Sequence, residues 1–93
     1  FSVNHAVISI GAIDASDGVM DYDLEEAEFA RTVLSRGARK LAITDATKFG
    51  RRGLVRVCGF DGLDELVTEG EPPAEIAQAL AAAGVRLTIS AGH

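Results

Sequence analysis

The sequence predicts an α/β fold, in which a mostly parallel sheet is flanked by helices. Apolar, β-branched segments alternate with segments whose apolar residues repeat at helical spacing, and this alternation is typical of parallel strands joined by right-handed crossovers. Hydrophobic residues make up 47% of the 93 residues and aromatic residues only 5%, so the core is built mainly from Ala, Val, Ile and Leu. No linker or composition shift divides the chain, and we expect one domain or a piece of one.

The chain opens with a predicted strand and a predicted loop. Residues 4–13 (NHAVISIGAI) are apolar and β-branched, as in a strand covered on both faces. Residues 14–23 (DASDGVMDYD) are acidic and contain glycine, which is typical of a loop. This loop should therefore follow the carboxyl end of the first strand.

A helix and a second strand are predicted next. Residues 24–38 carry alanine, valine and leucine at helical spacing, and Asp23 with Glu26 three residues later resembles a capping box. Gly37 is expected near the end of this helix. Residues 40–46 (KLAITDA) predict the second strand.

The second half of the chain predicts three more strands and a helix. Residues 54–60 (LVRVCGF) form the third expected strand and residues 65–69 (ELVTE) a short fourth one. Two prolines then lead into a predicted helix over residues 74–83, which ends at Gly84. Residues 85–90 (VRLTIS) are the last expected strand.

Charge and cysteine content exclude several function classes for this segment. Its net charge of −5 argues against nucleic-acid binding, so any DNA contact has to come from other parts of the protein. Cys58 is the only cysteine, which excludes an intrachain disulfide and a cysteine-based zinc site, and we expect it to be a small core residue. There is neither an apolar run of membrane-spanning length nor a basic leader typical of a signal peptide.

The loop after the second strand is a candidate ligand site, because ligands of parallel sheets bind outside the carboxyl ends of the strands. Asp45, Thr47 and Lys48 offer an acceptor, a hydroxyl and a cation, the mixture that a phosphorylated polyol needs. The plainer interpretation is an Asx-type turn with a solvated lysine. Arg51 and Arg52 add two cations, which could bind a ligand, contact another subunit or simply be solvated.

Acidic residues form the other candidate wall. Glu26 opens the first helix, where it offsets the helix macrodipole, but it could also accept hydrogen bonds from sugar hydroxyls. Asp14, Asp17 and Asp21 bring carboxylates to the first loop, yet their spacing lacks the calcium-loop pattern and no metal site is expected. The segment SIGAIDASDG is neither a Walker nor a Rossmann motif, so no nucleotide cofactor is expected.

Four stretches carry a further signal when they are taken together: NHAVISIGAID…DG, LEEAEFARTVLSRGARKLAITDATKFGRRGLVRV, LDELVTE and LAAAGVRLTIS. They resemble the C-terminal part of the effector domain of DeoR-family bacterial transcriptional regulators. The string D-x-[ST]-K-F-G-R at residues 45–51, at the usual distance after EEA, makes the resemblance fairly specific. The segment around Ser9 and Met20 departs from the family pattern at the presumed ligand pocket.

The resemblance implies a sugar-phosphate-sensing domain similar to ribose-5-phosphate isomerase and the CoA transferases. Residues 1–93 would be the C-terminal portion of this sensor, and a helix-turn-helix DNA-binding domain would precede it. The resemblance also implies a cytoplasmic homo-oligomer that uses no cofactor and represses genes of carbohydrate use. By position, it implies ligand contacts from Asp14, Glu26, Asp45 and Lys48, while Thr47 keeps the hydroxyl of the usual serine.

The leading hypothesis is therefore a sensor without catalytic residues that binds a phosphorylated sugar through Asp14, Glu26, Asp45, Thr47, Lys48 and Arg51. Two alternatives remain. An isomerase-like enzyme could use Glu26 as a base and a lysine as an electrophile. An oligomerisation module could keep the fold without binding a ligand.

Overall fold

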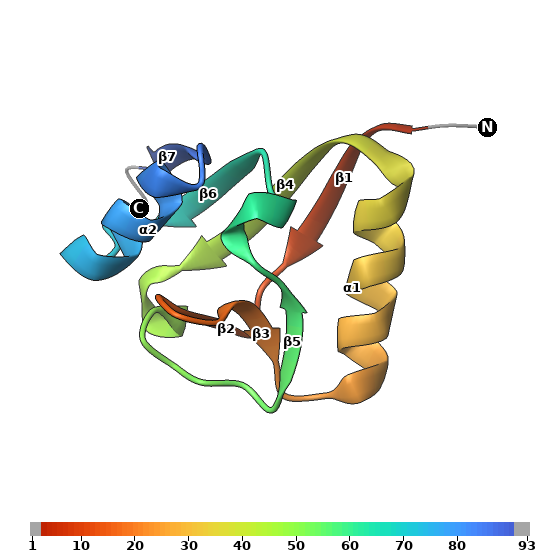
Figure 1. Cartoon of the computed structure of the whole chain (residues 1–93), viewed down its shortest axis with the longest axis horizontal. Helices are drawn as coiled ribbons and strands as arrows, with labels where there is room; N and C mark the ends of the chain where they lie inside the picture. Colours follow the sequence, from red (N-terminus) through yellow and green to blue (C-terminus); the bar gives the residue numbers. More distant parts are fainter. Residues whose placement is uncertain (1–2, 91–93) are drawn as a thin grey trace.

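The computed structural model describes residues 3–90, which form two sheets and two α-helices (Figure 1). The larger sheet is parallel and consists of β1 (Val3–Ser9), β4 (Gly37–Asp45), β6 (Glu65–Glu69) and β7 (Arg86–Ser90), in this order. The smaller sheet is antiparallel and consists of β2 (Ala12–Asp14), β3 (Gly18–Asp21) and β5 (Val55–Cys58). The helices are α1 (Leu24–Arg36) and α2 (Ala74–Ala82), and the predicted α/β class is confirmed.

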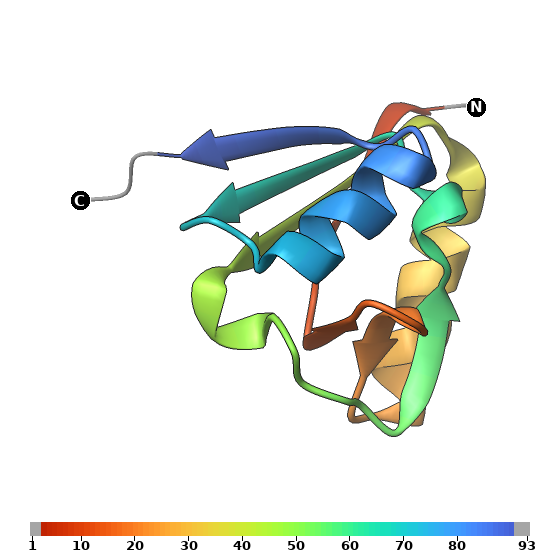
Figure 2. The ribbon, with the colours of Figure 1, turned by 60° about the vertical axis from the view of Figure 1, so that its left-hand side comes forward.

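All connections of the parallel sheet lie on one of its faces. Each crossover leads to the next strand in the same direction, and right-handed crossovers in one direction place every connecting segment on the same side. Figure 2 shows α2 and the smaller sheet on the same side of the four parallel strands. The opposite face of the sheet carries no element among residues 3–90.

Burial along the strands follows this one-sided arrangement. Ala42 and Leu66 are fully buried, whereas Val7 and Ile43, on the opposite face, are 50% and 49% exposed. The prediction that the first strand is covered on both faces is therefore wrong. From Ala6 to Ser9 its residues alternate between a packed face and an open face, although Val7 on the open face is apolar.

The predicted strand over residues 4–13 is in fact two strands. β1 ends at Ser9, the chain turns, and β2 pairs with β3 in a hairpin that occupies most of the predicted loop over residues 14–23. Gly18 starts β3 with a φ of +82°, and a Cβ there would lie 2.7 Å from the carbonyl oxygen of Cys58. Asp14 consequently lies in this hairpin and not at the carboxyl end of a parallel strand.

The boundaries of the helices agree well with those predicted. The Asp23 side chain caps α1 by accepting a hydrogen bond of 3.0 Å from the N–H of Glu25, and Gly37 is the C-cap. Ala27, Ala30 and Leu34 form the buried face of α1. Neither helix within residues 3–90 has the length and apolar content needed to cross a membrane.

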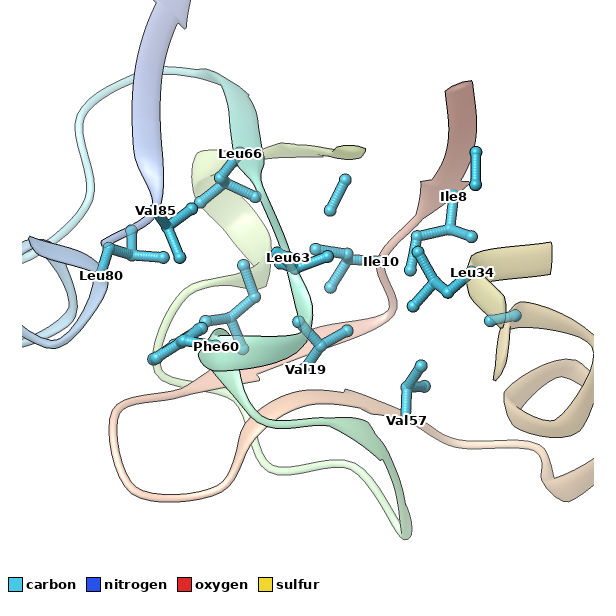
Figure 3. Packing of buried hydrophobic residues seen from close by; sticks show 14 of the residues in the cluster. Ile8, Ile10, Val19, Leu34, Val57, Phe60, Leu63, Leu66, Leu80 and Val85 are labelled. Carbon is cyan, nitrogen blue, oxygen red and sulfur yellow. The ribbon is translucent and has the colours of Figure 1, made fainter. Parts of the chain in front are cut away.

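The core lies between the two sheets and the two helices. Figure 3 shows members from β1 (Ile8), α1 (Leu34), β3 (Val19), β6 (Leu66) and α2 (Leu80). The predicted third strand, β5, pairs with β3 in the antiparallel sheet and so does not belong to the parallel one. Cys58 at its end is partly buried and packs against the core, and this burial raises the pKa of its thiol to about 11.

Candidate functional site

A polar cavity of about 380 Å³ lies beside the carboxyl end of β1. We call it the mixed-charge cavity, because both acidic and basic side chains line it. It is bounded by the turn after β1, the junction between β3 and α1, the short 3₁₀-helix η1 (Ala46–Lys48) and the loop after it. The lining residues are Ser9, Ile10, Gly11, Asp21, Tyr22, Asp23, Glu26, Lys48 and Arg51. Three of the predicted ligand contacts, Glu26, Lys48 and Arg51, therefore share one cavity.

One wall of the cavity is acidic. The Asp21 carboxylate is fixed in the turn before α1, because its Oδ1 accepts hydrogen bonds from the N–H groups of Tyr22 (2.7 Å) and Asp23 (3.3 Å). Glu26 follows in the first turn of the helix. Repulsion from Asp21 and, more weakly, from Asp23 raises the pKa of Glu26 above its ordinary value.

The other wall carries two cations, Lys48 and Arg51, from the connection between β4 and β5. Backbone hydrogen bonds hold this connection at both ends: the N–H of Gly50 donates to the carbonyl of Ile13 (2.8 Å), and the N–H of Leu54 to that of Asp21 (2.9 Å). The loop thus crosses the ends of β2 and β3, and Arg51 lies between the two anchoring points.

Glycine permits the second of these anchoring contacts. A Cβ on Gly53 would lie 2.6 Å from the carbonyl oxygen of Asp21, so any larger residue would force the loop away from β3. The cationic wall and the acidic wall are therefore joined through the backbone of Asp21.

Asp45 and Thr47 support η1 and do not line the cavity. Oδ1 of Asp45 accepts hydrogen bonds from the N–H of Thr47 (2.9 Å) and from its hydroxyl, and these bonds lower the pKa of Asp45. The expected Asx-type turn is thus present, and it carries Lys48 to the cavity. The structural interpretation therefore applies to Asp45 and Thr47, which form the turn, and the ligand-site interpretation applies to Lys48, which lines the cavity.

Asp14 and Arg52 lie away from this cavity. Asp14 accepts a hydrogen bond of 3.2 Å from the N–H of Asp17 and lines a separate cavity of about 370 Å³ near Pro73. Arg52 forms an ion pair of 2.6 Å with Asp17 at the tip of the β2–β3 hairpin. Of the two adjacent arginines, only Arg51 faces the mixed-charge cavity.

The sequence did not identify Asp21 and Tyr22 as cavity residues, because residues 14–23 were expected to be a loop. The hairpin brings Asp21 back to the end of β1. The sequence contains one indication of this hairpin. The dipeptide Asp17-Gly18, which is typical of hairpin turns, lies between the apolar pairs Ala12-Ile13 and Val19-Met20.

The arrangement suits a ligand with an anionic end and several hydroxyl groups. Ammonium and guanidinium groups donate to phosphate oxygens, and carboxylates accept from hydroxyls. Lys48 and Arg51 stand on one side of the cavity, and Asp21, Asp23 and Glu26 on the other. Within residues 3–90, no group of three or more His, Cys, Asp or Glu side chains could hold a metal ion.

Comparison with known proteins identifies the family. Residues 1–70 match the family model described as the DeoR C terminal sensor domain. The chain belongs to this family. The matched region contains every residue of the mixed-charge cavity, and the resemblance stated from the sequence is confirmed.

Three relatives are transcriptional repressors by name. The chain is 28% identical to the glycerol-3-phosphate regulon repressor of Haemophilus influenzae over 92 residues, which cover 99% of this chain and 36% of the relative. It is 24% identical to the repressor of the same name in Escherichia coli (86% and 32% covered). It is 28% identical to the HTH-type transcriptional repressor CsqR of Escherichia coli (82% and 29% covered). The chain thus spans about a third of the length of these curated relatives.

Proposed function

We propose that this chain is the ligand-sensing part of a DNA-binding transcriptional repressor, and that a phosphorylated sugar binds in the cavity between Glu26, Lys48 and Arg51. The observation that carries the proposal is the placement of two cations and three carboxylates around one cavity of about 380 Å³. Sites for small ligands commonly have volumes of about 300 to 1,000 Å³. A bare anion would be repelled by the acidic wall, whereas a sugar phosphate has groups for both walls.

In this proposal Lys48 and Arg51 bind the phosphate. Each charge-assisted hydrogen bond contributes about 1.5 to 3 kcal/mol. Glu26 and Asp21 accept hydrogen bonds from the sugar hydroxyls. Asp45 and Thr47 act indirectly, because their hydrogen bond holds the turn that carries Lys48.

Ligand binding then changes operator binding by shifting the population of two arrangements of the whole protein. A difference in binding free energy of about 1 to 3 kcal/mol between the arrangements changes operator affinity by about 5- to 150-fold. DNA is contacted by a helix-turn-helix domain outside residues 1–93, as the name of one relative suggests. The working protein is a cytoplasmic homo-oligomer, since helix-turn-helix regulators commonly read two half-sites.

The test uses the full-length protein and a panel of phosphorylated sugars with their unphosphorylated parents as controls. A sugar phosphate that binds should raise the melting temperature and change operator binding at the same concentration, whereas its parent sugar should do neither. Lys48→Ala should lose both responses and keep the melting temperature of the ligand-free protein, because this loop lysine adds little to packing. No response to any sugar phosphate at millimolar concentration would contradict the proposal and favour an oligomerisation module.

A further inference from the structure

A second groove, between β1 and α1, adjoins the mixed-charge cavity; it is polar at one end and apolar at the other. This groove has a volume of about 290 Å³ and shares Ser9, Asp21 and Glu26 with the cavity. Beyond these residues it is lined by Val7, Ile8, Phe29 and Ala30. The two spaces therefore meet at the residues proposed to accept hydrogen bonds from the sugar.

The directions of β1 and α1 explain why one end of the groove is polar and the other apolar. As a crossover helix, α1 runs back along β1, so its first turn lies near the end of β1 and its second turn near the middle. Glu26 and Ala30 are one helical turn apart on α1. Val7 and Ser9 both point to the open face of β1, and they border the groove because β1 is the edge strand of the sheet. Ser9 with Glu26 thus forms the polar end, and Val7 with Phe29 and Ala30 the apolar end.

The apolar end keeps much of its surface open to solvent. Phe29 is 72% exposed and Val7 is 50% exposed, whereas Ala30 is buried. Covering such side chains is favourable by about 25 cal/mol per Å². No charged side chain lines the groove beyond Asp21 and Glu26. A ligand that reaches this end therefore gains from carrying an apolar group there.

We infer that the preferred effector is a phosphorylated sugar with an apolar substituent, such as an N-acetyl group, which packs between Val7 and Phe29. The inference rests on the proposed function, because it places the phosphate at Lys48 and Arg51 and the sugar ring beside Glu26. The occupant is assigned to the ligand because the groove and the ligand cavity share three lining residues, Ser9, Asp21 and Glu26.

The test compares matched ligands on the full-length protein by calorimetry: glucose 6-phosphate with N-acetylglucosamine 6-phosphate, and galactose 6-phosphate with N-acetylgalactosamine 6-phosphate. In at least one pair the acetylated member should bind about 4-fold more tightly or better, the factor expected for one buried methyl group. Phe29→Ser and Val7→Thr should each reduce this preference and leave the affinity for the plain sugar phosphate within about 2-fold. Ile89→Ser, which changes an exposed apolar residue on β7, is the control and should keep the preference.

Three results would overturn the inference. Equal binding of both members of each pair would show that the groove does not contact the ligand, while the proposed function would stand. A preference that survives both Phe29→Ser and Val7→Thr would place the acetyl group elsewhere. A large fall in the melting temperature of the ligand-free protein in both variants would show that polypeptide fills the groove. Failure of all sugar phosphates to bind would instead contradict the proposed function itself.

Discussion

The guanidinium of Arg52 lies 2.6 Å from the carboxylate of Asp17, while the adjacent Arg51 lines the ligand cavity. Two neighbouring arginines thus have different partners: one ties the loop to the β2–β3 hairpin, and the other is available to a ligand. This difference provides a matched pair of variants.

Arg51→Ala should weaken binding of the sugar phosphate by about 10- to 150-fold, which corresponds to one charge-assisted hydrogen bond. Arg52→Ala should leave ligand affinity nearly unchanged and lower the free energy of unfolding by at most about 1 kcal/mol, because its ion pair is exposed. Calorimetric titration of both variants checks this. Equal losses of affinity would mean that the two arginines act through general charge and not through position.

Adjacent residues of β6 should differ strongly in their contribution to stability. Leu66 is fully buried in the core, whereas Val67 lies on the open face of the parallel sheet and is only partly buried. Leu66→Ala should lower the free energy of unfolding by about 2 to 5 kcal/mol. Val67→Ala should lower it by about 1 kcal/mol or less. Urea unfolding measures both, and similar values would show that the open face is covered in solution.

Glu65 should make the protein less stable in acid. Oε2 of Glu65 accepts a hydrogen bond of 2.7 Å from the Thr88 hydroxyl, and Oε1 accepts one of 2.9 Å from Arg39. These bonds lower the pKa of Glu65 in the folded state. The stabilisation is therefore complete above the unfolded pKa of about 4.3 and is lost as the pH falls through the lower folded value.

Thr88→Val removes the hydrogen bond from the Thr88 hydroxyl, which lowers the pKa of Glu65 more than the hydrogen bond from Arg39 does. The free energy of unfolding of the variant should fall less steeply than that of the wild type as the pH falls below about 4.3. Urea titrations at several pH values check this slope. Identical slopes would mean that the Thr88 hydroxyl does not stabilise the carboxylate.

Cys58 should react slowly with alkylating reagents in the folded protein. Burial raises the pKa of its thiol to about 11, and this outweighs the opposing effect of Arg56. At pH 8 the thiolate fraction should be at least about 100-fold smaller than for a free cysteine with a pKa near 8.5. Mass spectrometry after iodoacetamide treatment, with and without urea, measures the difference. Fast alkylation without urea would show that the end of β5 opens readily.

The parts of the fold that depend on local sequence were predictable. Asp23 and Gly37 identified the ends of α1, and ELVTE identified β6 to the residue, since caps and short strands are set by neighbouring residues. The break between β1 and β2 was not predictable in this way. Residues 6–13 are mostly apolar, and hydrophobicity alone does not show that Ile8 packs in the core beside α1 while Ile13 pairs with Val19 in another sheet.

The candidate site was predictable only in part for the same reason. Lys48 and Glu26 were found because each stands in a short string with its own chemistry. Asp21 reaches the cavity through hairpin pairing, and Asp14 leaves it for that reason. Tertiary contacts of the smaller sheet, and not the local sequence, decide which acids face the ligand.

Glu26 offers the sharpest test of the acidic wall. Because Asp21 and Asp23 raise its pKa, the folded protein holds this proton more tightly than the unfolded chain does. Stability should therefore decrease as the pH rises from about 4.3 through the folded pKa, which is the opposite of the effect of Glu65. Glu26→Gln removes the repulsion and should raise the melting temperature at pH 7, but not below about pH 3, where the carboxyl is neutral in both states. Glu25→Gln is the control, since Glu25 lies in the same helical turn but does not line the cavity. A lower melting temperature for Glu26→Gln than for Glu25→Gln at pH 7 would show that repulsion among the three carboxylates does not destabilise the folded protein.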